Sequence, residues 1–94
     1  MPRFIVERNI PGASTLSPTE LRDISAKSCE VIAGLSEPYT WITSYVAGDK
    51  VYCLHEARSA DAIRRHAREG GFPADVVSEV AAVIDPSTAD SLPA

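Results

Sequence analysis

Four stretches of the chain alternate between apolar and polar residues or are rich in β-branched and aromatic residues, and both patterns are typical of β-strands. They predict strands over residues 3–10, 39–47, 51–57 and 76–85. In two other stretches the apolar residues recur at helical spacings of three, four and seven, which indicates a helix with one buried face. These stretches predict helices over residues 18–34 and 60–70.

Residues that favour helix ends flank both predicted helices. Ser17 is placed to cap the first helix, with Pro18 at the first helical position and Glu20 completing a capping box. Ser59 is placed to cap the second helix, and Gly70–Gly71 is a typical helix end. The boundaries of both helices therefore follow from local chemistry as well as from periodicity.

The order of these elements along the chain is β-α-β-β-α-β. The second and third strands form a hairpin across Gly48–Asp49. This order predicts an α+β fold in which a four-stranded antiparallel sheet carries both helices on one face. Right-handed crossovers place the first and third strands at the centre and the other two at the edges. We expect one domain over residues 1–86 and a polar tail over residues 87–94.

Residues two apart in a strand share a face, so parity predicts what each face of the sheet carries. One face is almost wholly apolar and is assigned to the helices; it holds Phe4, Val6, Ile42, Val46, Val51, Cys53, Val80, Ala82 and Ile84. The open face mixes aromatic side chains with carboxylates; it holds Ile5, Glu7, Trp41, Tyr45, Tyr52, Leu54, Glu56, Glu79 and Val83. Exposed aromatic clusters of this kind mark interfaces, which predicts a homodimer through the open face.

Composition and charge narrow the class of protein. A net charge of −4, with 45% hydrophobic and 23% charged residues, is ordinary for a compact domain and gives no basic footprint for nucleic acid. No stretch of about 18 apolar residues suits a membrane span, so we expect a cytoplasmic protein. In that compartment Cys29 and Cys53 are expected as free thiols.

Motifs for nucleotide binding and for serine hydrolysis are missing, because the only glycine pair follows a helix and no GxSxG is present. A transition-metal site has better support. His55, Cys53 and His66 are imidazole and thiol groups that suit nickel, copper or zinc, and all three are candidates for the helix-covered side. His55 and Glu56 are neighbours on a strand and point to opposite faces.

Each candidate also has a structural interpretation. His66 is either an imidazole at the border of its helix that is hydrogen bonded to a neighbour, or a charged residue near the helix end, where the dipole favours a cation. Cys53 and Cys29 are then small hydrophobic side chains, and His55 is exposed or caps a strand end. Glu7 and Glu56 on the open face are either an acid and base pair or two solvated carboxylates at the rim of a dimer contact.

Three stretches together resemble a known family. FIVERNIPG, WITSYVAGDKVYCLHEA and IRRHAREGGFPAD, followed by SEV and IDP, are similar to the small actinobacterial nickel-binding proteins of ferredoxin-like fold. The resemblance covers residues 2 to about 88 and implies a ferredoxin-like dimer that holds nickel ions at the dimer surface, with a role in metal sequestration or detoxification. The HA and GGFP elements of the family match His66, Ala67 and residues 70–73. The resemblance therefore supports His66 as a metal ligand.

The sequence therefore predicts a non-catalytic protein that binds a transition metal, nickel by resemblance. The expected metal ligands are His66, His55, Glu56 and Cys53. Surface carboxylates such as Glu69 and Asp75 are further candidates if the metal lies at the surface. The alternative is a small enzyme or ligand carrier of the dimeric α/β-barrel type, whose intersubunit cavity on the open face is lined by Glu7, Trp41, Tyr52 and Glu56.

Overall fold

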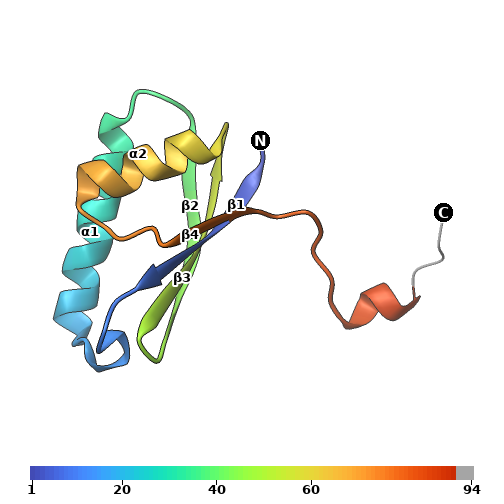
Figure 1. The fold of residues 1–94 in the computed structure, drawn as a ribbon, viewed down its shortest axis with the longest axis horizontal. Helices are drawn as coiled ribbons and strands as arrows, with labels where there is room; N and C mark the ends of the chain where they lie inside the picture. The colour runs from blue at the N-terminus through green and yellow to red at the C-terminus, as the bar shows by residue number, and fades with distance from the viewer. Residues whose placement is uncertain (91–94) are drawn as a thin grey trace.

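The computed structural model describes residues 1–90 of the chain (Figure 1). Its strands and helices, in chain order, are β1 Arg3–Asn9, α1 Pro18–Gly34, β2 Tyr39–Ala47, β3 Lys50–Ala57, α2 Ala60–Gly70 and β4 Val76–Glu79. Two short 3-10 helices are also present, η1 Ala13–Thr15 and η2 Pro86–Asp90. No helix among these residues is both long enough and apolar enough to span a bilayer.

The four strands form one antiparallel sheet in the order β2-β3-β1-β4. Both helices cover the same face of this sheet, and the other face is left open (Figure 1). The register is fixed on β1, where Val6 lies opposite Cys53 on β3 and opposite Val77 on β4. This is the ferredoxin-like α+β fold. The predicted order of the elements, the order of the strands in the sheet and the position of both helices on one face are confirmed.

The helix ends form as the sequence predicts. The Oγ of Ser17 accepts from the backbone N–H of Glu20 at 3.1 Å, and the Glu20 carboxylate accepts from the backbone N–H of Ser17 at 3.0 Å. At the end of α2, Gly71 has a left-handed backbone with φ of 70°, which a side chain disfavours. The chain then folds back so that the Phe72 ring lies against Gly70, where a Cβ atom would overlap the ring.

The core lies between α2 and the central strands and not evenly under both helices. Its buried residues are Phe4, Val6, Cys53, Ala57, Ala62 and Ile63. In α1, by contrast, Ser28 is the only fully buried residue of the helix, and Ile24 remains 39% exposed. The helix α1 is therefore held away from the sheet, which leaves room beneath it.

A β-bulge in β2 changes the predicted faces of that strand. Trp41 lies opposite His55, the register shifts between Trp41 and Thr43, and Ser44 then lies opposite Cys53. The extra residue is Ile42, which is 39% exposed. Trp41 consequently lies on the helix-covered face, and its predicted place on the open face is wrong because a bulge reverses the parity before it.

Beyond the bulge, parity holds in the hairpin. Tyr45 lies opposite Tyr52 and Val46 opposite Val51, as strands of regular register require. Tyr45 and Tyr52 are therefore on the open face as predicted, and Tyr45 is 68% exposed.

The last strand is shorter than predicted. β4 ends at Glu79, not at residue 85, and pairs Phe4 with Glu79 and Val6 with Val77. Val77, not Val80, therefore shares the helix-covered face, and Glu79 lies on that face instead of the open one. The predicted face assignments in this strand are wrong because its register with β1 is offset by one residue.

Residues 80–85 continue as an arm that leaves the domain and leads to η2 (Figure 1). Ala82 and Ile84 do not contact the helices as predicted, and Val83 is not covered by the sheet: Val83 is 78% and Ile84 is 77% exposed. Of the predicted polar tail, residues 87–90 belong to η2, and residues 91–94 lie outside the described part of the chain.

Candidate functional site

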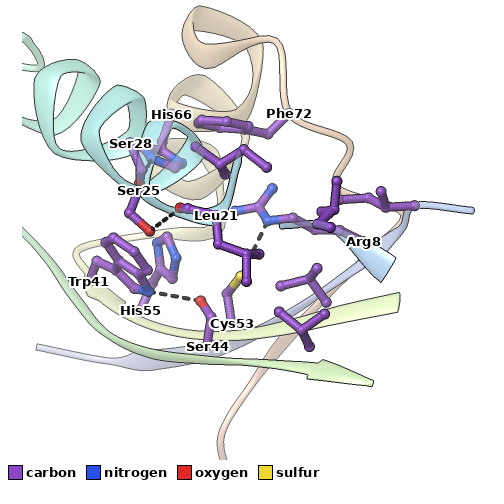
Figure 2. A pocket seen from close by; sticks show the side chains of 15 residues that line it. Arg8, Leu21, Ser25, Ser28, Trp41, Ser44, Cys53, His55, His66 and Phe72 are labelled. Atoms are coloured by element: carbon purple, nitrogen blue, oxygen red, sulfur yellow. Dashed lines mark hydrogen bonds between the residues drawn. The ribbon is translucent and has the colours of Figure 1, made fainter. Parts of the chain in front are cut away.

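The space beneath α1 is a cavity of about 90 Å³ between both helices and the sheet (Figure 2). Apolar side chains from α1, β2 and β3 form most of its wall. Arg8, Cys53, His55 and His66 also line it, together with Ser25, Ser28 and Ser44. Three of the four metal ligands expected from the sequence therefore line one cavity.

His66 is the most enclosed of these groups. It is 1% exposed and lies between the rings of Tyr39 and Phe72, with centroid distances of 5.1 and 5.4 Å and interplanar angles of 24° and 29°. Its Nε2 shares a hydrogen bond of 3.0 Å with the Oγ of Ser28, and its Nδ1 has no partner among residues 1–90. The helix α2 thus presents His66 to the sheet, as its stripe predicts.

His66 is neutral at physiological pH. Burial, followed by repulsion from Arg8, lowers the pKa of His66 from 6.5 to about 4, against a smaller opposing effect of the Glu69 carboxylate. Of the two structural interpretations of His66, the charged residue that complements the helix dipole is wrong, and the imidazole that is hydrogen bonded to a neighbour agrees with its bond to Ser28.

His55 is also buried and neutral. It is 1% exposed on the central strand β3, and its Nδ1 shares a short hydrogen bond with the hydroxyl of Tyr39. Burial, followed by repulsion from His66 and Arg8, lowers the pKa of His55 from 6.5 to about 3. The expectation that His55 is exposed at a strand end is wrong, because β3 continues to Ala57 and the Tyr39 ring lies edge-on to the imidazole.

Tyr39 and His55 share a hydrogen bond in which either group can be the donor. Burial raises the pKa of Tyr39, so its hydroxyl stays protonated, and the neutral imidazole carries one proton at Nδ1 or at Nε2. The hydroxyl and the Nδ1 of His55 therefore satisfy each other inside the fold in either tautomer.

Arg8 lines the cavity as well, and the sequence alone gave no role to it. It is only 5% exposed, its Nε donates to the Sγ of Cys53 at 3.4 Å, and its Nη1 donates to the carbonyl of Pro73. The guanidinium carbon lies 5.6 Å from the centroid of the Phe72 ring. Arg8 forms no ion pair with any carboxylate of residues 1–90. The available signal was a charged residue that interrupts the apolar face of β1.

The fourth expected ligand, Glu56, lies apart from the cavity. It is on the open face of β3 and accepts from the Nε of Arg3 at 3.2 Å. The two cysteines are both free: Cys53 is buried in the core, and Cys29 is exposed on α1 instead of being a buried hydrophobic residue. Glu69 pairs with Arg65 at 3.5 Å, and Asp75 accepts from the backbone N–H of Asn9 at 2.6 Å.

The cavity does not fit a nickel ion. Its donor types, imidazole and sulfur, are acceptable to nickel, and the Nδ1 of His66 has no partner among residues 1–90, but the Sγ of Cys53 accepts from the guanidinium of Arg8. The guanidinium of Arg8 would also repel a second cation in the cavity. Within residues 1–90, no group of three or more His, Cys, Asp and Glu side chains is gathered closely enough to hold a metal.

Comparison with known proteins gives two findings. A family model described as nickel responsive protein SCO4226-like matches residues 4–80. The crystal structure of SCO4226 from Streptomyces coelicolor A3(2) superposes with a TM-score of 0.72 at 24% sequence identity, covering 87% of this chain and 99% of that one. At this identity the superposition establishes the fold. A search among curated proteins found no match. Because the family model spans nearly all of β1 to β4, this chain belongs to the family of SCO4226-like nickel responsive proteins.

Proposed function

We propose that this protein binds nickel ions without catalysing a reaction and sequesters them in the cytoplasm. The observation that carries the proposal is the family match over residues 4–80, whose printed description is nickel responsive. A net charge of −4 is consistent with a cation as the ligand.

Glu56 is the nickel ligand that the geometry favours among the four expected from the sequence. Its carboxylate is anionic and partly exposed on the open face, and its partner Arg3 has a side chain that is 51% exposed. Exposed ion pairs of this kind contribute little stability, so an incoming metal can displace Arg3. Carboxylate and water ligands then form a weak surface site, away from the repulsion of Arg8.

A second copy of the chain is the partner that we propose for the open face. No helix of the described chain covers this face, and Ile5 and Tyr45 are 36% and 68% exposed on it. The arm over residues 80–85 carries Val83 and Ile84 away from its own domain, where a second copy can bury them. Dimerisation through the open face would bring two copies of Glu56 to one interface.

The alternative function, an enzyme with an intersubunit cavity on the open face, has less support. Trp41, one of its four expected lining residues, lies on the helix-covered face. The remaining carboxylates are paired, Glu56 with Arg3 and Glu7 with Lys50 at 3.5 Å.

Calorimetric titration with nickel tests the proposed function. Glu56→Gln should weaken nickel binding at least tenfold, whereas the matched change Glu30→Gln, on an exposed position of α1, should leave it unchanged. His66→Phe should also keep nickel binding, because its ring is in the cavity. Absence of nickel binding by the unaltered protein would overturn the function, and loss of binding in a folded His66→Phe variant would overturn the surface site.

A further inference from the structure

The cavity is lined by a buried positive charge that has no counter-ion among residues 1–90. Arg8 is 5% exposed and its guanidinium is held by a sulfur and a carbonyl oxygen, neither of which is a carboxylate. Arginine is almost never buried to this extent unless it is paired, because removing its charge from water is costly. An anion that reaches Arg8 would therefore compensate the cost of burying this charge.

A second polar group of the cavity also lacks a partner. The Nδ1 of the buried His66 has no hydrogen-bond partner among residues 1–90. His66 and Arg8 line the same cavity (Figure 2). The cavity is thus lined by a guanidinium without a counter-ion and by an unpartnered imidazole nitrogen. A carboxylate suits the guanidinium, which binds its two oxygens side by side.

Most of the rest of the cavity wall is apolar, so the remainder of the ligand should be apolar too. Leu21 and Ile24 of α1 face Val46 and Val51 of the hairpin across it. Ile24 and Val46 are each 39% exposed, so the cavity opens to solvent between α1 and β2. These walls offer no partners to a strongly hydrated ion such as phosphate, and they favour an alkyl chain.

We propose that the cavity beneath α1 binds a short-chain organic monocarboxylate, with the carboxylate at Arg8 and the alkyl chain between α1 and the β2–β3 hairpin. A volume of about 90 Å³ restricts the enclosed part of the ligand to a few carbon atoms, and the open mouth allows a longer chain to continue outward. This site is separate from the proposed nickel ligand Glu56, which lies on the opposite face of the sheet.

The sole tryptophan of the chain gives a direct readout. Trp41 lines the cavity, and its indole N–H donates to the Oγ of Ser44 at 2.8 Å. Its fluorescence can therefore be followed while the metal-free protein is titrated with hexanoate, with hexanol as the uncharged analogue and acetate as the analogue without the chain. Hexanoate should bind in the millimolar range or tighter, and hexanol and acetate should each bind at least tenfold more weakly.

Two variants and one control locate the site. Arg8→Gln should weaken hexanoate binding at least tenfold. Arg8 also contacts Phe72 and Pro73, so its replacement can disturb the fold. Ile24→Trp is therefore a second test, because it fills the mouth of the cavity and leaves Arg8 in place. It should weaken hexanoate binding to a similar extent, as measured by calorimetry. Ile84→Trp, on the exposed arm, should bind hexanoate as the unaltered protein does.

The proposal is overturned if hexanoate does not bind the unaltered protein, or if hexanol binds as tightly as hexanoate. It is also overturned if inorganic phosphate binds at least as tightly as hexanoate, because the apolar wall would then have no role. None of these outcomes depends on nickel, so they leave the proposed metal site to its own test.

Discussion

His55 and His66 lie with their ring centroids 5.2 Å apart, one from the central strand and one from the second helix, and Tyr39 contacts both rings. Tyr39 stacks on His66 and shares a hydrogen bond between its hydroxyl and the Nδ1 of His55. Two imidazoles that are both neutral and nearly inaccessible to solvent therefore join the sheet to α2. Their burial determines how the stability of the fold depends on pH.

Stability should fall as the solution is acidified below the pKa of a free histidine. The folded pKa values are about 3 for His55 and about 4 for His66, below the unfolded value of 6.5. Both groups therefore contribute stability above pH 6.5 and lose it as the pH falls towards those folded values, because the unfolded chain takes up the protons first. Each histidine should lower the free energy of unfolding by about 1.4 kcal/mol for each pH unit between pH 6 and roughly 4.5.

Urea unfolding at several pH values measures that loss. In His66→Phe, which keeps an aromatic ring between Tyr39 and Phe72, the slope of unfolding free energy against pH should be about half that of the unaltered protein. Equal slopes in the two proteins would show that His66 does not stay neutral in the fold.

Tyr39→Phe should destabilise the protein by about 1–3 kcal/mol, because it leaves the Nδ1 of the buried His55 without its hydrogen-bond partner. Tyr45→Phe removes the same hydroxyl from a ring that is 68% exposed, so it should change stability by less than about 0.5 kcal/mol. Chemical denaturation of both variants provides the comparison, and similar losses in the two would contradict a structural role for the Tyr39 hydroxyl.

The glycine pair at the end of α2 can be tested with a matched substitution. Gly70→Ala should cost about 1–3 kcal/mol, because the new Cβ would overlap the Phe72 ring beside His66. Gly34→Ala, near the end of α1, has no atom within 4 Å of the new Cβ and should be neutral or stabilising by up to about 1 kcal/mol. In thermal unfolding, Gly70→Ala should lower the melting temperature and Gly34→Ala should leave it unchanged or raise it. A Gly70→Ala variant as stable as Gly34→Ala would show that Phe72 is free to move.

The exposed arm predicts a change in oligomeric state. Replacing Val83 and Ile84 together with aspartate should weaken the proposed dimer, since the two side chains are 78% and 77% exposed in the single chain. Ala89→Asp, in the exposed η2, adds charge without removing a large apolar group and should leave the dimer intact. Sedimentation equilibrium over a range of concentrations gives the result, and a monomeric unaltered protein would contradict the proposed interface.

Local sequence signals predicted the helices and the sheet order well. Ser17, Glu20 and Gly71 act on the backbone within a few residues, so their effect is visible without the fold. The bulge at Ile42 was not predictable in this way, because it depends on how Trp41 packs opposite His55 on another strand. The end of β4 at Glu79 likewise depends on where β1 begins beside it, since Glu79 pairs with Phe4.

The site was predicted in part for a similar reason. Periodicity brought His66 and Cys53 to the helix-covered face, but the burial of His55 depends on Tyr39 from a neighbouring strand. Arg8 interrupted an apolar pattern, and only the fold shows that this charge turns inward to Cys53 and Pro73. A charge at an apolar position was therefore the signal that most needed the structure for its interpretation.

We propose that nickel binds at the surface near Glu56, while the histidine cavity stays free of metal because the Arg8 guanidinium lines it. Nuclear magnetic resonance of the isotope-labelled protein during nickel titration tests it directly, since octahedral nickel is paramagnetic and broadens signals near it. We predict broadening at Glu56 and Arg3, with the ring signals of His55 and His66 unchanged. Selective broadening of the His55 and His66 rings, with Glu56 unaffected, would contradict the account.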